Sequence, residues 1–351
     1  MNATLYRQVV ALQRPIRASY ETHNERTRLY LRIEHGGHWG FGEVSPQPHE
    51  LNGDPGLSEV LDAVYLALAR LEQVLLREGD LPHWARVARL GAATPRDNVA
   101  YSLLEMAILD RELRRDDRSI TDLWSAIGYT PEQQTVSLLD ETPWSIGDAV
   151  ARVRVKCAPG ALSAQSRERL SQVSVPLFLD FNCSANDDEE VLEMVAAVSS
   201  VANVDAVEQP FAAGNIVDHA RLAARLDVNV SLDEGVRSVR DLAQIDRYRA
   251  AAMVCVKPAR VGGLANARTM ILRAQEFGLR VYLGGFFESP YARRVHRALA
   301  NSCVREPSDL AAVGVSAHEE AAMTSSSFGV EPSLLVLEEA DSLPVLSQDG
   351  P

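Results

Sequence analysis

Five short apolar segments in the middle of the chain each end in an ionisable side chain. The residues at these ends are Lys156, Asp180, Glu208, the pair Asp233-Glu234, and Lys257. Any one of them alone is more often a helix cap or a solvated charge than a ligand. If the segments are neighbouring parallel strands, their carboxyl ends meet at one edge of a sheet. Three acidic ends would then repel each other unless they share a cation, and oxygen ligands alone favour Mg²⁺ or Mn²⁺.

The two lysines flank the acidic ends on either side. A lysine shielded from water near other cations has a lowered pKa and can act as a base. A divalent cation can hold a substrate carboxylate and stabilise the enediolate left when the adjacent α-proton is removed. Lys156 and Lys257 follow segments four apart in chain order, so an eight-stranded barrel would place one amine on each side of a substrate. Asn182 shares a strand face with Asp180, and the last segment leads to Glu288.

Residues 151–157, ARVRVKC, carry an uncompensated row of cations. As a strand, this segment places Arg152, Arg154 and Lys156 on one face and apolar residues on the other. We expect their compensation to come from the acidic ends of the neighbouring strands. Lys156 is predicted to lie at the mouth of the site, Arg154 one layer below in support of it, and Arg152 in a structural ion pair.

Seven short apolar runs recur between residues 135 and 286. They are TVSLLD (135–140), VRVKC (153–157), VPLFLDFN (175–182), VDAVEQP (204–210), VNVSLDE (228–234), AMVCVKP (252–258) and LRVYLGGF (279–286). Most gaps between them have helical spacing, and such strand–helix repeats indicate parallel βα units. With a less regular eighth strand near 301–306, the pattern favours a (β/α)8-type barrel, and an open doubly wound sheet stays the alternative. The first gap, of about a dozen residues, predicts a truncated or irregular crossover helix.

The first 120 residues have a different order of strand-like and helical segments. Strand-like segments at 4–12, 28–35 and 38–44 are followed by helical patterns at 57–77, 82–91 and 96–115. This order is typical of an α+β unit. Gly36-Gly37, between the last two strand-like segments, predicts a hairpin.

Composition narrows the class of protein. The 351 residues are 46% hydrophobic and 24% charged, with a net charge of −13 and a pI of about 5.1. An acidic chain has no overall field that attracts nucleic acid or anionic membranes. The four cysteines are widely scattered, which indicates reduced thiols in a cytoplasm rather than zinc or disulfide sites. No run is long enough for a membrane helix, and the first residues lack the apolar core of a signal peptide.

The residues at the strand ends resemble those of the enolase superfamily and, within it, of the muconate-lactonising subgroup. Arg154-Val155-Lys156 is similar to the K-x-K motif of the family's second barrel strand, with its first lysine replaced. The segments that resemble o-succinylbenzoate synthases and the related N-succinylamino acid racemases are KCAPG (156–160), VKPARVGGLANA (256–267) and GGFFESP (284–290). GFGEVSP (40–46) is similar to the family's capping domain. The histidine base of the mandelate racemase subgroup is missing.

The resemblance implies an α/β fold, a (β/α)7β-type TIM barrel with an α+β capping domain. The cap would comprise residues 1–125, with 328–351 returning to it, and the catalytic barrel residues 126–327. The metal ligands would be Asp180, Glu208 and Asp233, and the catalytic residues Lys156 and Lys257. The supporting residues would be Arg154, Asn182, Glu234 and Glu288.

The activity implied is that of a cytoplasmic, Mg²⁺-dependent lyase that removes the proton α to a carboxylate through an enediolate. The most similar group is o-succinylbenzoate synthase, a syn dehydratase of menaquinone biosynthesis. Lys156 would take the α-proton and return it to the departing hydroxyl, while Lys257 stabilises the enolate as a cation. In a racemase, Lys257 would instead be the second acid/base. The partner is a small carboxylate substrate, not nucleic acid or membrane, and the oligomeric state stays open.

Other activities stay open. The nearest alternative is N-succinylamino acid racemase, or another racemase or cycloisomerase of the muconate-lactonising type. A dipeptide epimerase is disfavoured, because the region after the last strand holds Asp309 in place of an Asp-x-Asp pair. A Schiff-base aldolase could use Lys257 but leaves the carboxylates unexplained. A protein that keeps the barrel but has lost its activity is a further alternative, and Arg154 would be the evidence for it.

Substrate selection is expected from two cap loops near 18–26 and 46–54. Their polar composition, with Gly53 and Pro55 in or beside the second loop, is typical of loops that close over a barrel mouth. His23 and His49 are predicted to be surface residues of these loops rather than catalytic groups.

Overall fold

The computed structural model describes residues 1–17, 22–91, 94–140, 144–157, 160, 162–310 and 338–339. One sheet is antiparallel and contains, in the order β11-β1-β2-β3, the strands β1 (Asn2–Arg17), β2 (Thr22–His35), β3 (His38–Val44) and β11 (Glu338–Glu339). The helical segments that follow β3 are α1 (Leu57–Glu78), the 3₁₀ helix η1 (Trp84–Leu90), α2 (Pro95–Arg115) and the 3₁₀ helix η2 (Ile120–Asp122). The predicted α+β order is therefore confirmed, although the 82–91 segment is a 3₁₀ helix.

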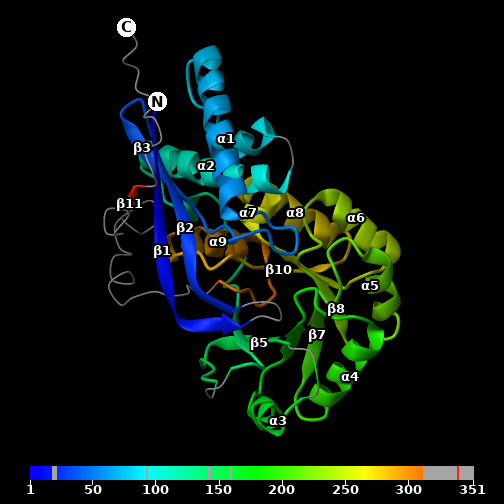
Figure 1. Cartoon of the computed structure of the whole chain (residues 1–351). Helices are drawn as coiled ribbons and strands as arrows, with labels where there is room; N and C mark the ends of the chain where they lie inside the picture. The colour runs from blue at the N-terminus through cyan, green and yellow to red at the C-terminus, as the bar shows by residue number, and fades with distance from the viewer. Residues whose placement is uncertain are drawn as a thin grey trace.

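A second sheet is parallel and holds the rest of the described chain. Its strands are β4 (Glu132–Ser137), β5 (Val150–Lys156), β6 (Leu177–Asp180), β7 (Val204–Glu208), β8 (Asn229–Leu232), β9 (Met253–Val256) and β10 (Arg280–Leu283). The helices between and after them are α3 (Ala164–Ser171), α4 (Asp188–Ser199), α5 (Ile216–Ala223), α6 (Val239–Tyr248), α7 (Pro258–Val261), α8 (Leu264–Glu276) and α9 (Pro290–Cys303). Figure 1 shows this sheet curling beside the antiparallel sheet, with α4, α5 and α6 along its outer side.

The order of the parallel strands decides between the two predicted architectures. Neighbours in the sheet are neighbours in the chain, from β4 at one edge to β10 at the other. A doubly wound sheet reverses its strand order at a switch point, and this sheet does not. The register aligns the strand ends, because Lys156 pairs with Asp180 and Asp180 pairs with Glu208. The predicted meeting of these ends at one edge is confirmed.

A short segment at Ser308 links the two edges of the parallel sheet. Ser308 forms a parallel bridge with Glu132, the first residue of β4, and the neighbouring Asp309 N–H donates to Leu283 O of β10. The eighth strand expected at 301–306 is wrong, since residues 301–303 end helix α9. Within the described residues the parallel sheet is curled and has seven strands, and the segment at Ser308 lies between its two edges, where an eighth strand would close a barrel. No helix joins β4 to β5 in the described residues 138–140 and 144–149, as the short gap predicted.

Two glycines let the antiparallel sheet pack closely on α2. A Cβ on Gly42 would lie 2.2 Å from Leu103 O, and one on Gly40 would lie 2.2 Å from the Arg111 backbone nitrogen. Both glycines lie on one face of β3, which faces the backbone of the helix. The hairpin before β3 is also confirmed, because His35 pairs with His38 across the predicted Gly36-Gly37 turn.

The ends of the chain and the domain limits are only partly described. Glu338–Glu339 pairs with Arg7 and Tyr6 of β1, and the other residues of the predicted returning segment, 328–351, lie outside the described residues. The domain boundaries stay a prediction.

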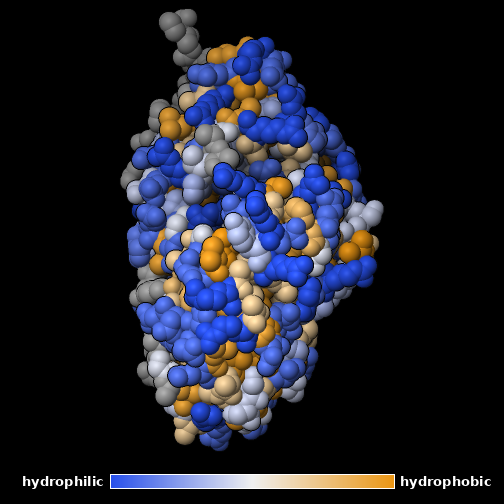
Figure 2. All heavy atoms as spheres, turned by 90° about the vertical axis from the view of Figure 1, so that its right-hand side faces the viewer, coloured by the Kyte–Doolittle hydropathy of each residue, from blue (hydrophilic) through white to orange (hydrophobic). Residues whose placement is uncertain are grey.

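Among the described residues, no helix combines the length and apolar character needed to cross a bilayer. Figure 2 shows apolar side chains scattered among charged ones on the face that it views.

Glu105 of α2 offers a test of how α2 packs against the start of α8. Its carboxylate accepts backbone N–H groups of Leu264 and Ala265 at the start of α8, and burial raises its pKa from 4.5 to about 8. Unfolding at pH values between these two pKa values therefore releases a proton, so the free energy of unfolding falls as pH rises. The side chain of the Glu105→Gln variant cannot titrate. The free energy of unfolding of this variant should therefore lack the fall with pH, which is on the order of a few kcal/mol because one pKa unit corresponds to about 1.4 kcal/mol.

Urea unfolding of wild type and Glu105→Gln from pH 5 to pH 8.5 measures this difference in slope. Glutamine has one acceptor oxygen and loses one of the two hydrogen bonds. This loss lowers the free energy of unfolding by the same amount at every pH and leaves its slope against pH unchanged. Glu276→Gln, at an exposed helix position, should keep the wild-type slope. Equal slopes for wild type and Glu105→Gln would show that Glu105 is already ionised in the folded protein.

Candidate active site

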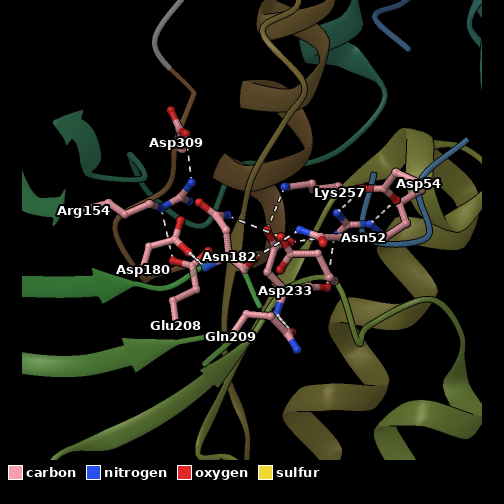
Figure 3. A network of polar contacts seen from close by, with 12 residues as sticks. Asn52, Asp54, Arg154, Asp180, Asn182, Glu208, Gln209, Asp233, Lys257 and Asp309 are labelled. Atoms are coloured by element: carbon pink, nitrogen blue, oxygen red, sulfur yellow. Dashed lines mark hydrogen bonds and ion pairs between the residues drawn. The ribbon is translucent and has the colours of Figure 1, made fainter. Parts of the chain in front are cut away.

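A single pocket at the strand ends gathers most of the predicted site residues (Figure 3). Those that line it are Arg154, Lys156, Asn182, Glu234 and Lys257. The three predicted metal ligands, Asp180, Glu208 and Asp233, are buried below these residues and contact them. Glu288 is not among the lining residues. It is buried and forms an ion pair with Arg293 at 3.1 Å.

Lys156, at the end of β5, is held by the end of β6. Its Nζ donates to Asp180 Oδ2 at 2.6 Å and to Asn182 Oδ1 at 2.7 Å. The Asn182 N–H in turn donates to the other oxygen of Asp180 at 2.9 Å. Asn182 has a φ of 47°, in the left-handed region that asparagine tolerates better than most residues. The predicted role of Asn182 beside Asp180 therefore has a direct geometric basis.

Lys257 follows β9 and is paired with Asp233. Its Nζ lies 2.7 Å from Asp233 Oδ2 and 4.8 Å from the centre of the Phe286 ring. Burial, the largest single effect, would lower the pKa of Lys257, but the negative neighbours led by Asp233 together outweigh it, and the pKa is raised. The sequence-based expectation of a lowered pKa counted a metal ion and neighbouring cations, and the carboxylate of Asp233 acts in the opposite direction.

Arg154, one layer below Lys156, lies between two acids that are distant in sequence, Glu208 of β7 and Asp309. Its Nε lies 3.1 Å from Glu208 Oε2, and its Nη1 lies 3.4 Å from Asp309 Oδ2. We expected Arg154 to support Lys156, but the contacts that the structure gives are to Glu208 and Asp309. Arg152, deeper in the same strand, forms an ion pair with Glu306 at 3.6 Å, and its guanidinium lies 3.7 Å from the centre of the Phe178 ring. Its predicted structural ion pair is confirmed.

The carboxylates fit a divalent cation by their chemistry. Both oxygens of Glu208 are buried and have no hydrogen-bond partner among the described residues. Burial raises the pKa of Glu208 to about 8. Burial would also raise the pKa of Asp233, but Arg260 and Lys257 hold it far below its usual range. Hard oxygen donors of this kind suit Mg²⁺ or Mn²⁺ by their chemistry.

Glu234 lies behind the ligand positions. Burial, followed by the charge of Asp233, raises its pKa to about 6. Asn182 Nδ2 donates to Glu234 Oε1 at 3.4 Å, and Glu234 Oε2 has no hydrogen-bond partner among the described residues. The turn that carries it is fixed by Gln209, whose Oε1 accepts from the Asp233 and Gly235 N–H groups at 2.9 and 3.1 Å. The sequence analysis missed Gln209, although it follows Glu208 directly.

Arg260 is a second residue that the sequence analysis missed. Its guanidinium contacts Asp54 Oδ2 at 2.6 Å and Asp233 Oδ1 at 2.5 Å. It therefore connects the loop 46–54 with a predicted metal ligand. Its position in the sequence could have indicated this role. Arg260 lies in the one-turn helix α7, three residues after Lys257, and at this spacing a helical side chain points to the same side as Lys257.

The loop at 46–54 covers the pocket as predicted. Gln47, Leu51, Asn52 and Asp54 line it. Arg237 ties this loop down by donating to Gly53 O and Asn52 O at 2.5 and 2.7 Å and to Glu234 O at 2.9 Å.

The other predicted loop differs from the expectation. Residues 22–26 belong to β2, and residues 18–21 lie outside the described residues. His23 is 8% exposed and lines the pocket, so its prediction as a surface residue is wrong. It faces Phe287, with 6.3 Å between the ring centres. His49 is exposed, as predicted.

Comparison with known proteins agrees with this geometry. A family model described as "Enolase C-terminal domain-like" matches residues 155–326. Residues 155–326 therefore form a C-terminal domain of the enolase superfamily. A crystal structure of an enolase superfamily member from Listeria innocua has the same fold, with a TM-score of 0.73 and 22% identity over 88% of this chain and 85% of that chain.

Two named relatives of this superfamily member have different activities. An N-succinylamino acid racemase of Amycolatopsis is 29% identical, and the match covers 85% of this chain and 82% of the relative. An o-succinylbenzoate synthase of Enterococcus faecalis is 25% identical, with 84% and 82% covered. Both relatives are enzymes, and so is this member of the superfamily. The identities are too similar to choose between a lyase and a racemase.

Arg154 offers a direct test of charge compensation in this superfamily member. Arg154→Met leaves Glu208 and Asp309 without their shared cation, and breaking such a buried pair costs about 3 kcal/mol of unfolding free energy. Arg154→Lys should recover only part of the loss, because one ammonium lacks the planar fork that contacts two carboxylates. Urea unfolding in the presence of a chelator measures both variants.

The matched control for this test is Arg221→Met. Arg221 also pairs with two acids, Asp188 and Asp218, but at the surface. Its replacement should change the unfolding midpoint little. A loss for Arg154→Met no larger than that of the control would contradict the compensating role.

Proposed function

We propose that this enzyme removes the proton α to a substrate carboxylate, with Lys156 and Lys257 as its acid/base and cationic groups. The most specific form of the proposal is o-succinylbenzoate synthase. One observation supports it above all. The chain has two lysines against 33 arginines, and both lysines line the same pocket. Arginine does not give up its proton in proteins, whereas lysine can, so the amines stand where proton transfer needs them.

Asp180, Glu208 and Asp233 would hold a divalent cation, Mg²⁺ or Mn²⁺. When bound, such an ion supplies positive charge for the substrate carboxylate and for the enediolate that forms from it. The oxygen-only donor set supports this assignment, as do the buried oxygens of Glu208, which accept no hydrogen bond from the described residues although Oε2 faces Arg154. Glu234 and Asn182 would keep the ligand carboxylates in position from behind.

Lys156 would act as the base. Its Nζ, already placed by Asp180 and Asn182, takes the α-proton in its neutral form and becomes an ammonium. In a synthase, the same ammonium returns the proton to the departing hydroxyl, which leaves as water from the same face. Lys257 would remain a cation, since its Nζ contacts Asp233 and lies against the Phe286 ring. This held cation would stabilise the negative charge of the enediolate.

N-succinylamino acid racemase is the second candidate. The relative from Amycolatopsis with that name supports it. The position of the two lysines at the ends of β5 and β9, with three strands of the sheet between them, also supports it. In that reaction Lys257 would deliver or take a proton on the face opposite Lys156. A Schiff-base aldolase is not favoured, because each lysine is paired with a carboxylate of the predicted ligand set.

Hydrogen exchange at the α-carbon tests the proposed base. With Mg²⁺ in D₂O, wild type should exchange the α-proton of the o-succinylbenzoate precursor or of an N-succinylamino acid, as followed by proton NMR. Lys156→Ala and Lys156→Arg should both lose about 10²–10⁴-fold in rate, because neither supplies a base. A chelator should stop exchange and added Mg²⁺ should restore it. Near-normal exchange by Lys156→Arg would sink the proposal.

Selective ¹⁵N-lysine labelling supplies the control for intact folding. Wild type should give two side-chain ammonium signals, one for each lysine. Each single variant should keep the other signal at its wild-type position if the pocket is undisturbed.

Lys257 separates the two candidate reactions. In a racemase, Lys257→Ala should still exchange the enantiomer whose proton faces Lys156 but should not invert either one. In a synthase, the same variant should slow dehydration without any substrate being racemised. Chiral chromatography after incubation with each enantiomer gives the answer.

A further inference from the structure

Gln47 of the loop 46–54 carries an amide group whose two ends can be told apart. Arg26 Nη1 donates to Gln47 Oε1 at 2.9 Å. A guanidinium has no acceptor, so the atom that faces Arg26 is the oxygen, and the NH₂ group is the other end of the amide. Gln47 lines the pocket and is partly exposed. Its Nε2 donates to no acceptor among the described residues, so this donor is available to a ligand.

The backbone and Arg26 both restrict the position of Gln47. The residue stands between Pro46 and Pro48, and a proline limits the conformations of the residue before it as well as its own. The backbone of Gln47 also forms a parallel bridge with Gly56. Arg26 is 1% exposed, and its Nη2 donates to Pro46 O at 3.1 Å. The amide is therefore held in one orientation before a substrate enters.

Positive charge lies behind this amide. The Arg26 guanidinium is bound to its oxygen and lies 5.1 Å from the centre of the ring of Phe287, which lines the same pocket. A cation at Oε1 polarises the amide, which makes the NH₂ group of Gln47 a stronger donor toward a negative oxygen. Asp54, the acid of the same loop, does not compete for this donor, because both of its oxygens accept from Arg260.

We propose that Gln47 is a specificity-determining residue, which donates a hydrogen bond to a carboxylate at the end of the substrate away from the reacting carbon. The pocket then takes dicarboxylates, with one carboxylate at the predicted metal ligands and the other at the loop 46–54. This inference rests on the proposed function, because that function places the reacting carboxylate at the strand ends. Both candidate reactions use succinyl substrates, which carry such a second carboxylate.

N-succinylglycine and N-butanoylglycine are the probes, because they differ only in having a carboxylate or a methyl group at the distal end. Glycine has no stereocentre, so racemisation leaves both molecules unchanged, and calorimetry with Mg²⁺ present measures equilibrium binding. Wild type should bind N-succinylglycine roughly 10- to 100-fold more tightly, which is the range for one hydrogen bond to a charged group.

Gln47→Glu keeps an oxygen for Arg26 and replaces the NH₂ group with a second, negative oxygen. This variant should lose or reverse the preference, since its carboxylate would face the carboxylate of the probe. The matched control is Gln73→Glu, which makes the same exchange at an exposed position of α1 and should keep the wild-type ratio of the two affinities.

The terminal amide of N-succinylglycine tests whether the distal group must be charged, and it should bind more weakly to wild type than the carboxylate does. The proposal is overturned if wild type binds this amide as tightly, if it binds the first two probes equally or binds neither, or if Gln47→Glu keeps the preference. Exchange of the α-protons of N-butanoylglycine in D₂O reports Lys156 and needs no distal carboxylate. Exchange without a binding preference would refute the role of Gln47 alone, and a preference without exchange would refute the role of Lys156 alone.

Discussion

Compensation of buried negative charge is the constraint on which this site depends. Asp180, Glu208 and Asp233 end three adjacent strands and lie at most 1% exposed. Carboxylates this close and this dry cannot all ionise unless cations lie against them. The chain supplies one for each: Lys156 for Asp180, Arg154 for Glu208, and both Lys257 and Arg260 for Asp233. The row of cations in β5 is therefore the counterpart of the acidic strand ends.

The strand ends were predictable because one physical rule places them. Alternation along each strand selects the inner face, and parallel pairing in register brings the ends to one edge. Lys156, Asp180 and Glu208 are paired in that order across β5, β6 and β7, as the pattern indicated. The hairpin at Gly36-Gly37 and helices α1 and α2 follow from equally local signals.

What could not be predicted depends on contacts between distant segments. Arg260 reaches Asp54, 206 positions away in sequence, and no periodicity in either segment encodes that pair. His23 was taken for a loop residue because its neighbours are polar, yet β2 extends through it and buries its ring against Phe287. The link at Ser308 likewise escapes sequence patterns, since one bridging residue at the sheet edge has no strand period.

The distribution of lysine and arginine explains why the middle cation of β5 is an arginine. A cation that must stay charged between Glu208 and Asp309 is better served by a guanidinium, which keeps its proton and contacts both carboxylates at once. A residue that must exchange protons cannot be an arginine. Arg154 therefore lowers the electrostatic cost of the buried acids, and in the proposed mechanism the proton transfer would fall to Lys156, the other cation at this end of the strand. With an arginine at position 154, permanent compensation and the proposed proton transfer would be the tasks of two different residues.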